Sequence, residues 1–212
     1  MKVETFTNGI YRENAYVVGK KGGGGERALI IDPGSDADGI AAILDANGWT
    51  PAAILATHAH FDHVGAVAPL MAKYDIPFHL HRADEALLKR MNLYKMVIDP
   101  GAALKVPEIT HDLAGVADLA TGGFDIAVLA SPGHTPGGVC FRIGDELFTG
   151  DTVLPAGVGR IDLPGGDGRA LEASVAMLRT LPRNLTAHPG HGASMALGDL
   201  LDNLQDQRAA RS

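Results

Sequence analysis

One short segment of the sequence holds four side chains that can bind a metal ion. It reads Thr57-His58-Ala59-His60-Phe61-Asp62-His63, so that three imidazoles and a carboxylate lie within six residues. Imidazole and carboxylate groups suit zinc, iron or manganese, and no thiolate stands beside them. Burying four ionisable groups next to an apolar strand is costly unless they have partners. A metal site is therefore a better interpretation of this segment than a polar turn.

Three further groups of the same kind follow predicted strands elsewhere in the chain. His134 follows the apolar run 126–130, Asp151 follows 146–149, and His191 follows 185–188. Loops at the carboxyl ends of strands are where sites are built on open sheets. Four separate strand ends that carry such groups indicate one shared site rather than four unrelated turns.

The dense cluster itself lies between a predicted strand and a predicted helix. The strand covers 53–57 and the helix covers 64–74. Side chains two residues apart leave a strand on the same side, which applies to His58 and His60. Asp62 and His63 then fall in the turn into the helix. The two pairs can thus reach two neighbouring points in space.

Composition and charge place limits on the class of protein. The chain has 212 residues, 46% of them hydrophobic and 20% charged, which predicts a single globular domain over 1–212. Its net charge of −7 disfavours nucleic acid as a partner. The apolar runs fall short of the roughly 20 residues that a membrane helix needs, and no signal peptide is evident. We expect a cytoplasmic protein without membrane contact.

Twice along the chain, a series of predicted strands is followed by predicted helices. The predicted helices cover 36–48, 64–74, 82–91, 167–181 and 197–204, with strands before and between them. Residues 22–25 and the glycine-rich stretch 154–168 are expected to be loops, and the end from 206 to 212 is expected to fray. Two β-rich halves, each followed by helices, predict two sheets packed face to face with helices outside.

The set of motifs closely resembles the metallo-β-lactamase superfamily. The resemblance extends from Val3 to Leu204 and combines HAHFDH with later GHT, GD and GHG motifs. It implies an α/β fold of four layers, an αββα sandwich with two mixed sheets face to face. It also implies two metal ions: the first held by His58, His60 and His134, the second by Asp62, His63 and His191, and Asp151 shared between them.

Within this superfamily the chain looks most like the glyoxalase II type of thioesterase. The supporting stretches are 32–34, 132–138 and 159–166, together with Asp rather than Cys at 151. The chain ends at Ser212, which leaves no room for the extra helical domain of the eukaryotic type and favours the short bacterial and archaeal branch.

The resemblance implies a reaction as well as a site. The substrate would be a small 2-hydroxyacyl thioester such as S-lactoylglutathione, attacked by a hydroxide that bridges two divalent ions, with Asp62 as the catalytic carboxylate. Zn²⁺ is the first expectation for both ions, and Fe or Mn are alternatives.

Other functions stay open at this level. A persulfide dioxygenase with one non-haem iron has a similar motif and uses the positions of His58, His134 and Asp151, although Pro189-Gly190-His191-Gly192 resembles the hydrolases. Hydrolysis of another ester or of a lactone is a further possibility, and a metal-binding module without activity is a third. Nothing in the sequence defines the oligomeric state.

Several single residues have two interpretations each. Arg160 could bind a substrate carboxylate or form an ion pair with Asp162. The second His-x-His pair, His79 and His81, lacks the following Asp-His and is interpreted as part of a strand. Cys140 lies in an apolar run and is expected to be buried. As the only cysteine, it excludes an intramolecular disulfide.

Overall fold

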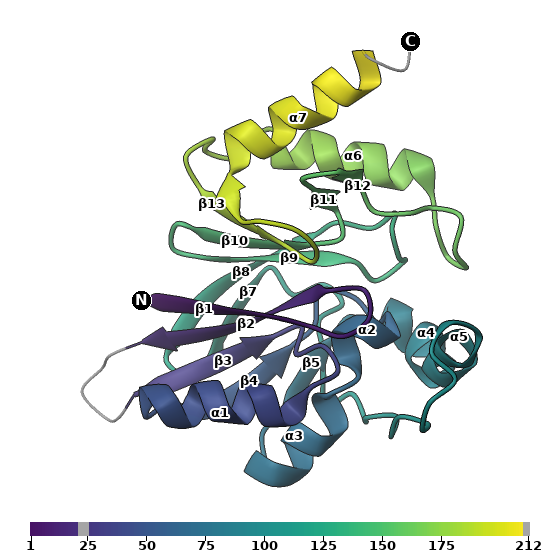
Figure 1. Cartoon of the computed structure of the whole chain (residues 1–212). Coiled ribbons are helices and arrows are strands. Elements are labelled where there is room, and N and C mark those ends of the chain that lie inside the picture. Colours follow the sequence, from purple (N-terminus) through teal and green to yellow (C-terminus); the bar gives the residue numbers. More distant parts are fainter. Residues whose placement is uncertain (21–25, 210–212) are drawn as a thin grey trace.

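The computed structural model describes residues 1–20 and 26–209. The predicted loop at 22–25 and the last three residues of the predicted tail lie outside the described residues. Figure 1 shows two β-sheets stacked face to face, with helices on both outer faces. The predicted αββα sandwich of the α/β class is confirmed.

Each sheet is mixed and, within the described residues, has six strands. The first sheet has the order β1-β2-β3-β4-β5-β6, with antiparallel pairs up to β3 and parallel pairs beyond it. These strands are β1 (Lys2–Asn8), β2 (Glu13–Lys20), β3 (Arg27–Ile31), β4 (Thr50–Leu55), β5 (Phe78–Leu80) and β6 (His111–Asp112). A parallel strand needs a crossover, and helices provide it between β3, β4 and β5.

The second sheet has the order β14-β13-β10-β9-β8-β7, and only β10 and β13 run parallel among its described pairs. Its strands are β7 (Asp118–Thr121), β8 (Phe124–Ala130), β9 (Val139–Ile143), β10 (Glu146–Gly150), β13 (Thr186–Pro189) and β14 (Met195–Ala196). The hairpin between β9 and β10 turns at Gly144, whose φ of 61° lies in the left-handed region that favours glycine.

Helices form the two outer layers. α1 (Ala37–Asn47) and α3 (Val67–Tyr74) cover the first sheet, whereas α6 (Gly168–Leu178) and α7 (Leu197–Ala209) cover the second (Figure 1). Two helices begin at an aspartate whose side chain accepts from backbone N–H groups of the first turn, as N-caps do: Asp36 in α1 and Asp167 in α6. Among the described residues, none of the helices has the length and apolar character that a membrane crossing requires.

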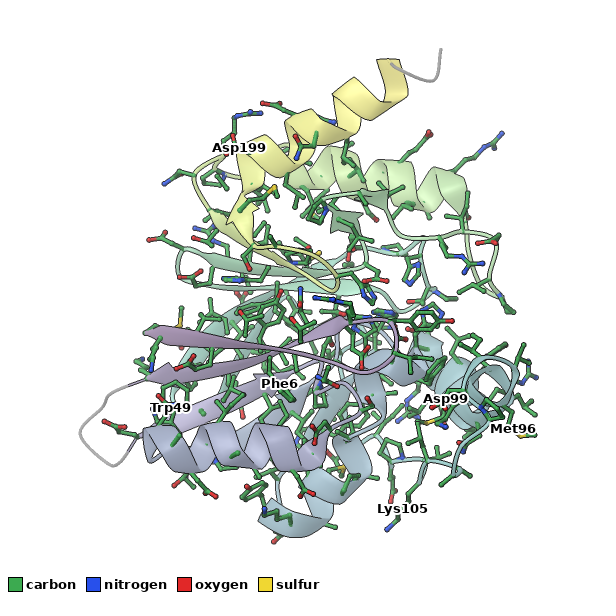
Figure 2. All side chains as sticks on the ribbon, viewed as in Figure 1. Phe6, Trp49, Met96, Asp99, Lys105 and Asp199 are labelled. Atoms are coloured by element: carbon green, nitrogen blue, oxygen red, sulfur yellow. The ribbon has the colours of Figure 1, made fainter. Side chains whose placement is uncertain are left out.

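The core fills the three spaces between the four layers. Side chains of β3 alternate, so that Ala28 and Ile30 face α1 and α3 while Leu29 and Ile31 face the second sheet. There they meet aromatic residues such as Phe141 of β9. A third cluster lies between the second sheet and α6 and α7. Figure 2 shows these side chains filling the spaces between the ribbons.

The structure corrects the bounds of several predicted elements. The predicted helix 64–74 is two helices, α2 (Phe61–Val64) and α3, because the Ala66 N–H donates to the Gly34 carbonyl and leaves the helical ladder. The predicted helix 82–91 is a 3₁₀ turn, η1 (Arg82–Asp84), followed by α4 (Glu85–Lys89).

Three further differences concern the ends of elements. An unpredicted helix, α5 (Met91–Ile98), follows α4 at the side of the sandwich (Figure 1). The stretch 154–168 includes part of a small hairpin, β11 (Val153–Leu154) and β12 (Gly157–Val158). α6 ends before 181, and α7 continues to Ala209 into the segment expected to fray.

Candidate metal centre

The first donor cluster combines a loop from each sheet. His58 and His60 follow β4 of the first sheet, and His134 lies in the loop between β8 and β9 of the second. One ligand atom of each can be chosen so that all three lie within 4.8 Å of one another. His60 Nδ1 and His134 Nε2 face each other at 2.9 Å. Three imidazoles at this spacing match the donor set of a divalent transition metal.

The second donor cluster lies beside the first and is more acidic. It consists of Asp62 and His63 from α2 and His191 from the loop after β13, again within 4.8 Å. His191 Nε2 lies 3.5 Å from Asp62 Oδ2, and His63 Nε2 lies 3.7 Å from the same oxygen. Asp62 and His63 are thus in a helical turn, where the sequence predicted only a turn into a helix.

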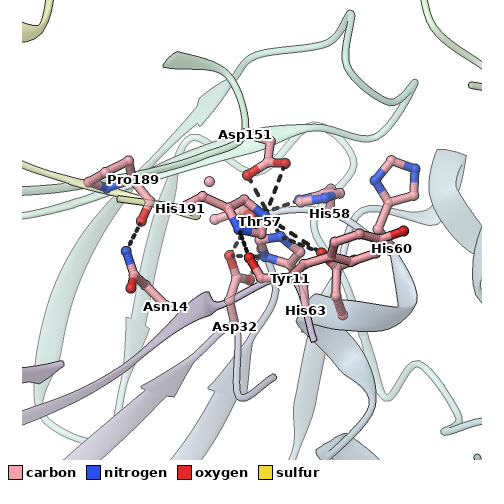
Figure 3. Close-up of polar contacts among 12 residues, drawn as sticks. Tyr11, Asn14, Asp32, Thr57, His58, His60, His63, Asp151, Pro189 and His191 are labelled. Carbon is pink, nitrogen blue, oxygen red and sulfur yellow. Dashed lines mark hydrogen bonds and ion pairs between the residues drawn. The ribbon is translucent and has the colours of Figure 1, made fainter. Parts of the chain in front are cut away.

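Asp151 lies between the two clusters (Figure 3). Its Oδ1 is 3.7 Å from His63 Nε2, while its Oδ2 is 3.5 Å from His134 Nε2 and 3.6 Å from His191 Nε2. One carboxylate therefore faces donors of both clusters. The structure brings together all seven residues that the sequence singled out as ligands: His58, His60, Asp62, His63, His134, Asp151 and His191.

A hydrogen bond at the ring nitrogen Nδ1 fixes the orientation of most of these imidazoles. His63 Nδ1 donates to Asp32 Oδ2 at 3.1 Å. His134 and His191 each donate through Nδ1 to a backbone carbonyl, that of Arg160 at 2.7 Å and that of Tyr11 at 3.1 Å. Such bonds orient each ring and place the lone pair of a neutral imidazole on Nε2, the atom that can bind a metal.

His58 obtains the same tautomer through Thr57. The Thr57 hydroxyl donates to Asp32 Oδ2 at 2.6 Å, so its oxygen accepts from His58 Nδ1 at 3.0 Å. The lone pair of His58 then lies on Nε2, the atom that faces the cluster. Thr57 also donates its backbone N–H to Asp32 Oδ1, at 2.7 Å.

Burial keeps two imidazoles of the first cluster, His58 and His60, neutral. It lowers the pKa of His58 well below its ordinary value, with the neighbouring imidazoles adding to the effect. Burial, followed by His134, lowers the pKa of His60 to about 3. Both rings are therefore unprotonated at neutral pH, which is the form that binds a metal.

In the second cluster the pKa of His63 shifts in the opposite direction, upward. Burial alone lowers the pKa of His63, but the carboxylates of Asp62, Asp151 and Asp32 outweigh it and raise that pKa to about 10. Burial raises the pKa of Asp62, yet His63 and His191 bring it well below its ordinary range. Without a metal this cluster holds a proton on His63, and a bound cation would take the place of that proton.

Unpartnered buried atoms show that the residues fit a metal. Within the described residues, no hydrogen-bond partner exists for the buried Nε2 atoms of His58, His60 and His63 or for Oδ1 of Asp151. Buried polar atoms normally have partners, and several lacking them at one place fit the donors of a cation site. The nitrogen and oxygen donor set suits zinc, iron or manganese.

Asp32 holds the first-sheet part of the site. It follows β3, is almost fully buried, and accepts hydrogen bonds from both Thr57 and His63. Its φ of 45° lies in the left-handed region, which aspartate tolerates better than most residues. The sequence interpretation used this residue only as a mark of resemblance.

Asp84 joins the two loops of the first cluster. This buried carboxylate accepts from the Ala59 N–H at 3.1 Å, between His58 and His60. It also accepts from the Gly137 N–H at 2.6 Å, in the loop that carries His134. Burial raises the pKa of Asp84, and these backbone bonds oppose that effect. The sequence interpretation missed this residue, because one acid in a predicted helix carries no signal.

Residues of β2 hold the loop that carries His191. Asn14 donates from its backbone N–H to the Gly190 carbonyl at 2.7 Å and from its side chain to the Pro189 carbonyl at 3.0 Å. The hydroxyl of Tyr16 donates to the same Pro189 carbonyl at 2.6 Å. Gly190 itself has no room for a side chain, because a Cβ there would lie 2.2 Å from Asp151 Oδ1.

A cavity of about 420 Å³ opens directly over the two clusters. Arg160 lies in its wall, and its Nε and Nη2 donate to the two carboxylate oxygens of Asp162 at 2.9 and 2.8 Å. The ion pair weighed from the sequence is thus present, beside the cavity. Tyr11 and Phe61 also line it, whereas Tyr16 is buried between the sheets.

Sequence comparison identifies the family. A model of the metallo-β-lactamase superfamily matches residues 9–195. The chain belongs to this superfamily. It is 34% identical to the probable metallo-hydrolase YqgX of Bacillus subtilis, over 91% of this chain and 90% of that protein. It is also 34% identical to a hydroxyacylglutathione hydrolase of Anaeromyxobacter dehalogenans, over 79% of this chain and 58% of that protein.

Solved structures of the superfamily agree over nearly the whole chain. The crystal structure of TTHA1623 in a di-iron-bound form has a TM-score of 0.82 and 40% identity, over 93% of this chain and 96% of that one. The BLEG-1 B3 metallo-β-lactamase has a TM-score of 0.87 and 32% identity, over 95% and 97%. Family and relatives together support a metal-dependent hydrolase.

The remaining polar residues of the sequence interpretation lie away from this superfamily site. His79 is buried in β5 and stacks on His111, with ring centroids 4.5 Å apart. His81 Nδ1 accepts from the Ala83 N–H and caps η1. Cys140 is fully buried, as expected, with its thiol 3.3 Å from Ser131 Oγ.

Proposed function

We propose that this protein is a thioesterase of the glyoxalase II type that works with two metal ions. The observation that carries the proposal is the pair of donor clusters, joined by Asp151, at the floor of a cavity large enough for a small ligand. A single ion would leave the donors of one of the two clusters without a metal.

The seven ligand residues divide as the resemblance implies. His58, His60 and His134 would hold one ion, Asp62, His63 and His191 the other, and Asp151 both. Two such ions, when bound, lower the pKa of a water molecule and polarise the carbonyl of an ester. Zn²⁺ is our first candidate, and the di-iron form of TTHA1623 makes iron the principal alternative.

The protein's own residues supply orientation and charge. The hydrogen bonds to Asp32, Arg160 and Tyr11 hold the rings of three imidazoles in a fixed orientation before a metal arrives. Asp62, the catalytic carboxylate that the resemblance implies, lies at the wall of the cavity, and its lowered pKa keeps it ionised at neutral pH. Of the described residues that line the cavity, Arg160 alone is a lysine or arginine, and a carboxylate on a substrate would reach it by displacing Asp162.

The first substrates to test are 2-hydroxyacyl thioesters such as S-lactoylglutathione. The partial match to a hydroxyacylglutathione hydrolase supports this choice. We expect the metal-loaded protein to contain close to two ions per chain and to hydrolyse a thioester, measured by elemental analysis and by release of the thiol.

The alternatives give different results in the same experiment. Full activity with one iron, and oxygen consumption with glutathione persulfide, would identify the dioxygenase instead. Hydrolysis of a lactone or a β-lactam without any thioester hydrolysis would keep the metal site and overturn the thioesterase.

A further inference from the structure

We infer that this cavity selects thioesters with an uncharged, apolar acyl chain, and that α5 forms the wall that selects them. The inference rests on the proposed two-metal thioesterase and goes beyond it, because it assigns an apolar acyl chain where the resemblance implies a 2-hydroxyacyl group. It comes from the residues that line the cavity beyond the metal-binding groups.

The lining away from the donor clusters is almost entirely apolar. Leu87 of α4 and Tyr94, Val97 and Ile98 of α5 line one side of the cavity. Further apolar or aromatic residues complete the lining: Tyr11, Phe61, Leu154, Val158, Leu163 and Pro164. A surface of this kind binds by removing hydrocarbon from water and offers few groups that could hold a charged ligand.

The cavity offers little positive charge to an anionic thiol such as glutathione. Among the described lining residues, Arg160 is the single lysine or arginine. Its guanidinium already makes two hydrogen bonds to Asp162 and is 67% exposed. A carboxylate on the substrate would have to compete with Asp162 for a solvated ion pair, which contributes little binding energy.

α5 exposes apolar side chains at the mouth of the cavity. Val97 is 85% and Ile98 is 45% exposed, although both line the cavity. When a hydrocarbon chain covers apolar groups that are exposed to water at the mouth of a pocket, the free energy of the complex is lowered. Met96 of the same helix is equally apolar and 65% exposed and lies at the outer edge of the molecule (Figure 2), but it does not line the cavity. It therefore provides a matched control.

The first experiment measures kcat/KM of the metal-loaded protein over a series of thioesters. Thioesters of N-acetylcysteamine with acetyl, butyryl, hexanoyl and octanoyl groups keep the thiol constant while the acyl chain grows. We expect kcat/KM to rise about two- to fourfold for each methylene that enters the cavity. A flat series, or a more than tenfold preference for hexanoylglutathione over the hexanoyl ester of N-acetylcysteamine, would overturn the inference.

The second experiment places a charge on the wall. Val97→Lys should lower kcat/KM for the hexanoyl and octanoyl esters about tenfold or more and leave the acetyl ester within about twofold. Met96→Lys adds the same charge on the same helix and should change neither. Both side chains are exposed, and thermal unfolding of the variants checks that the fold is kept. Equal effects of the two variants would contradict a specific role of the α5 wall.

A binding measurement separates this inference from the proposed function. Calorimetry with hexanamide and acetamide measures binding to the cavity, because neither probe is a thioester that could be hydrolysed. Both probes are neutral, and hexanamide alone carries a longer alkyl chain. We expect hexanamide to bind with a negative heat-capacity change and Val97→Lys to weaken it. If hexanamide binds and no thioester is cleaved, the proposed function fails and the apolar site stands. If thioesters are cleaved without dependence on chain length and hexanamide does not bind, the function stands and this inference fails.

Discussion

At the scale of single residues, the site consists of donors whose orientation is fixed from behind. His63 shows this most clearly, because its Nδ1 donates to Asp32 while its buried Nε2 has no hydrogen-bond partner among the described residues. An imidazole fixed in this way loses little further freedom when a metal binds, which raises affinity. The residues behind the ligands should therefore matter nearly as much as the ligands.

Asp32→Asn tests whether Asp32 positions the metal ligands. The amide can keep one acceptor oxygen but cannot accept from both donors of Thr57 and from His63 at once, so His63 is released. We expect metal affinity to fall about 10- to 100-fold, measured by competition with a chromophoric chelator. Asp36→Asn is the control on the same loop, because asparagine caps a helix as well as aspartate does. An unchanged affinity in Asp32→Asn would contradict the positioning role.

Asp151 and His81 separate the ligand set from an imidazole that lies elsewhere. Asp151→Ala removes the carboxylate that faces both clusters, and we expect activity to fall by orders of magnitude and metal content to drop. His81→Ala removes only a cap of η1 and should leave the metal content unchanged and the activity near that of the wild type. Activity assays and elemental analysis check both variants. Comparable losses in the two would show that the ligand assignment is wrong.

At the scale of elements, the sequence predicted well the strands that are buried on both faces. Residues 53–55, inside the predicted strand 53–57, are a continuous apolar run, as expected for an inner strand of a mixed sheet. Short elements gave too little periodicity to be found: α2 is one helical turn and β6 has two residues. α5 was missed because Leu93, Met96 and Val97 are exposed, so its apolar residues do not form a single buried stripe.

The same limit applies to the site. The seven metal-ligand candidates could be predicted because histidines are few, and five of the nine in the chain, together with Asp62 and Asp151, follow predicted strands. The role of Asp84 depends on contacts with Ala59 and Gly137, which are 25 and 53 residues away in the chain. No local pattern encodes such a contact, because it arises only once the loops of the two sheets have met.

Asp84→Asn tests the link between these loops. Asparagine has one acceptor oxygen for two backbone donors, so either the Ala59 or the Gly137 N–H loses its partner. We expect the cluster of His58, His60 and His134 to lose affinity while the other cluster keeps its ion, so that elemental analysis approaches one metal per chain. Glu85→Gln, at an exposed neighbouring position, should keep two. A merely structural role would lower the melting temperature without this selective loss.

At the scale of the whole molecule, the donors come from both halves of the sandwich. His58, His60, Asp62 and His63 follow a strand of the first sheet, whereas His134, Asp151 and His191 follow strands of the second. Hydrogen bonds between the halves already exist, from Val139 N–H to the Thr57 carbonyl and from Tyr16 to Pro189. A metal bound to donors of both sheets should therefore stabilise the entire fold rather than one loop.

The stability of the metal-free protein should depend on pH in a way that the metal removes. The pKa of His63 is about 10 in the folded chain and about 6.5 when unfolded, so its contribution is complete below pH 6.5 and is lost as the pH rises through 10. The lowered pKa values of His58 and His60 act in the other direction, and their neutral burial costs stability as the pH falls below about 6.5.

We therefore expect the metal-free protein to be most stable near neutral pH and to lose at least about 5 °C in Tm between pH 7 and 10, since about 1 kcal/mol corresponds to 2–4 °C at this size. With metal bound, His63 has exchanged its proton for the cation and cannot lose it on the alkaline side. The Tm gained from metal should then increase from pH 7 to 10. Calorimetric scans of metal-free and metal-loaded protein over this range measure the difference. A parallel decline of both forms would mean that the cation does not replace the proton on His63, and that His63 is not a ligand.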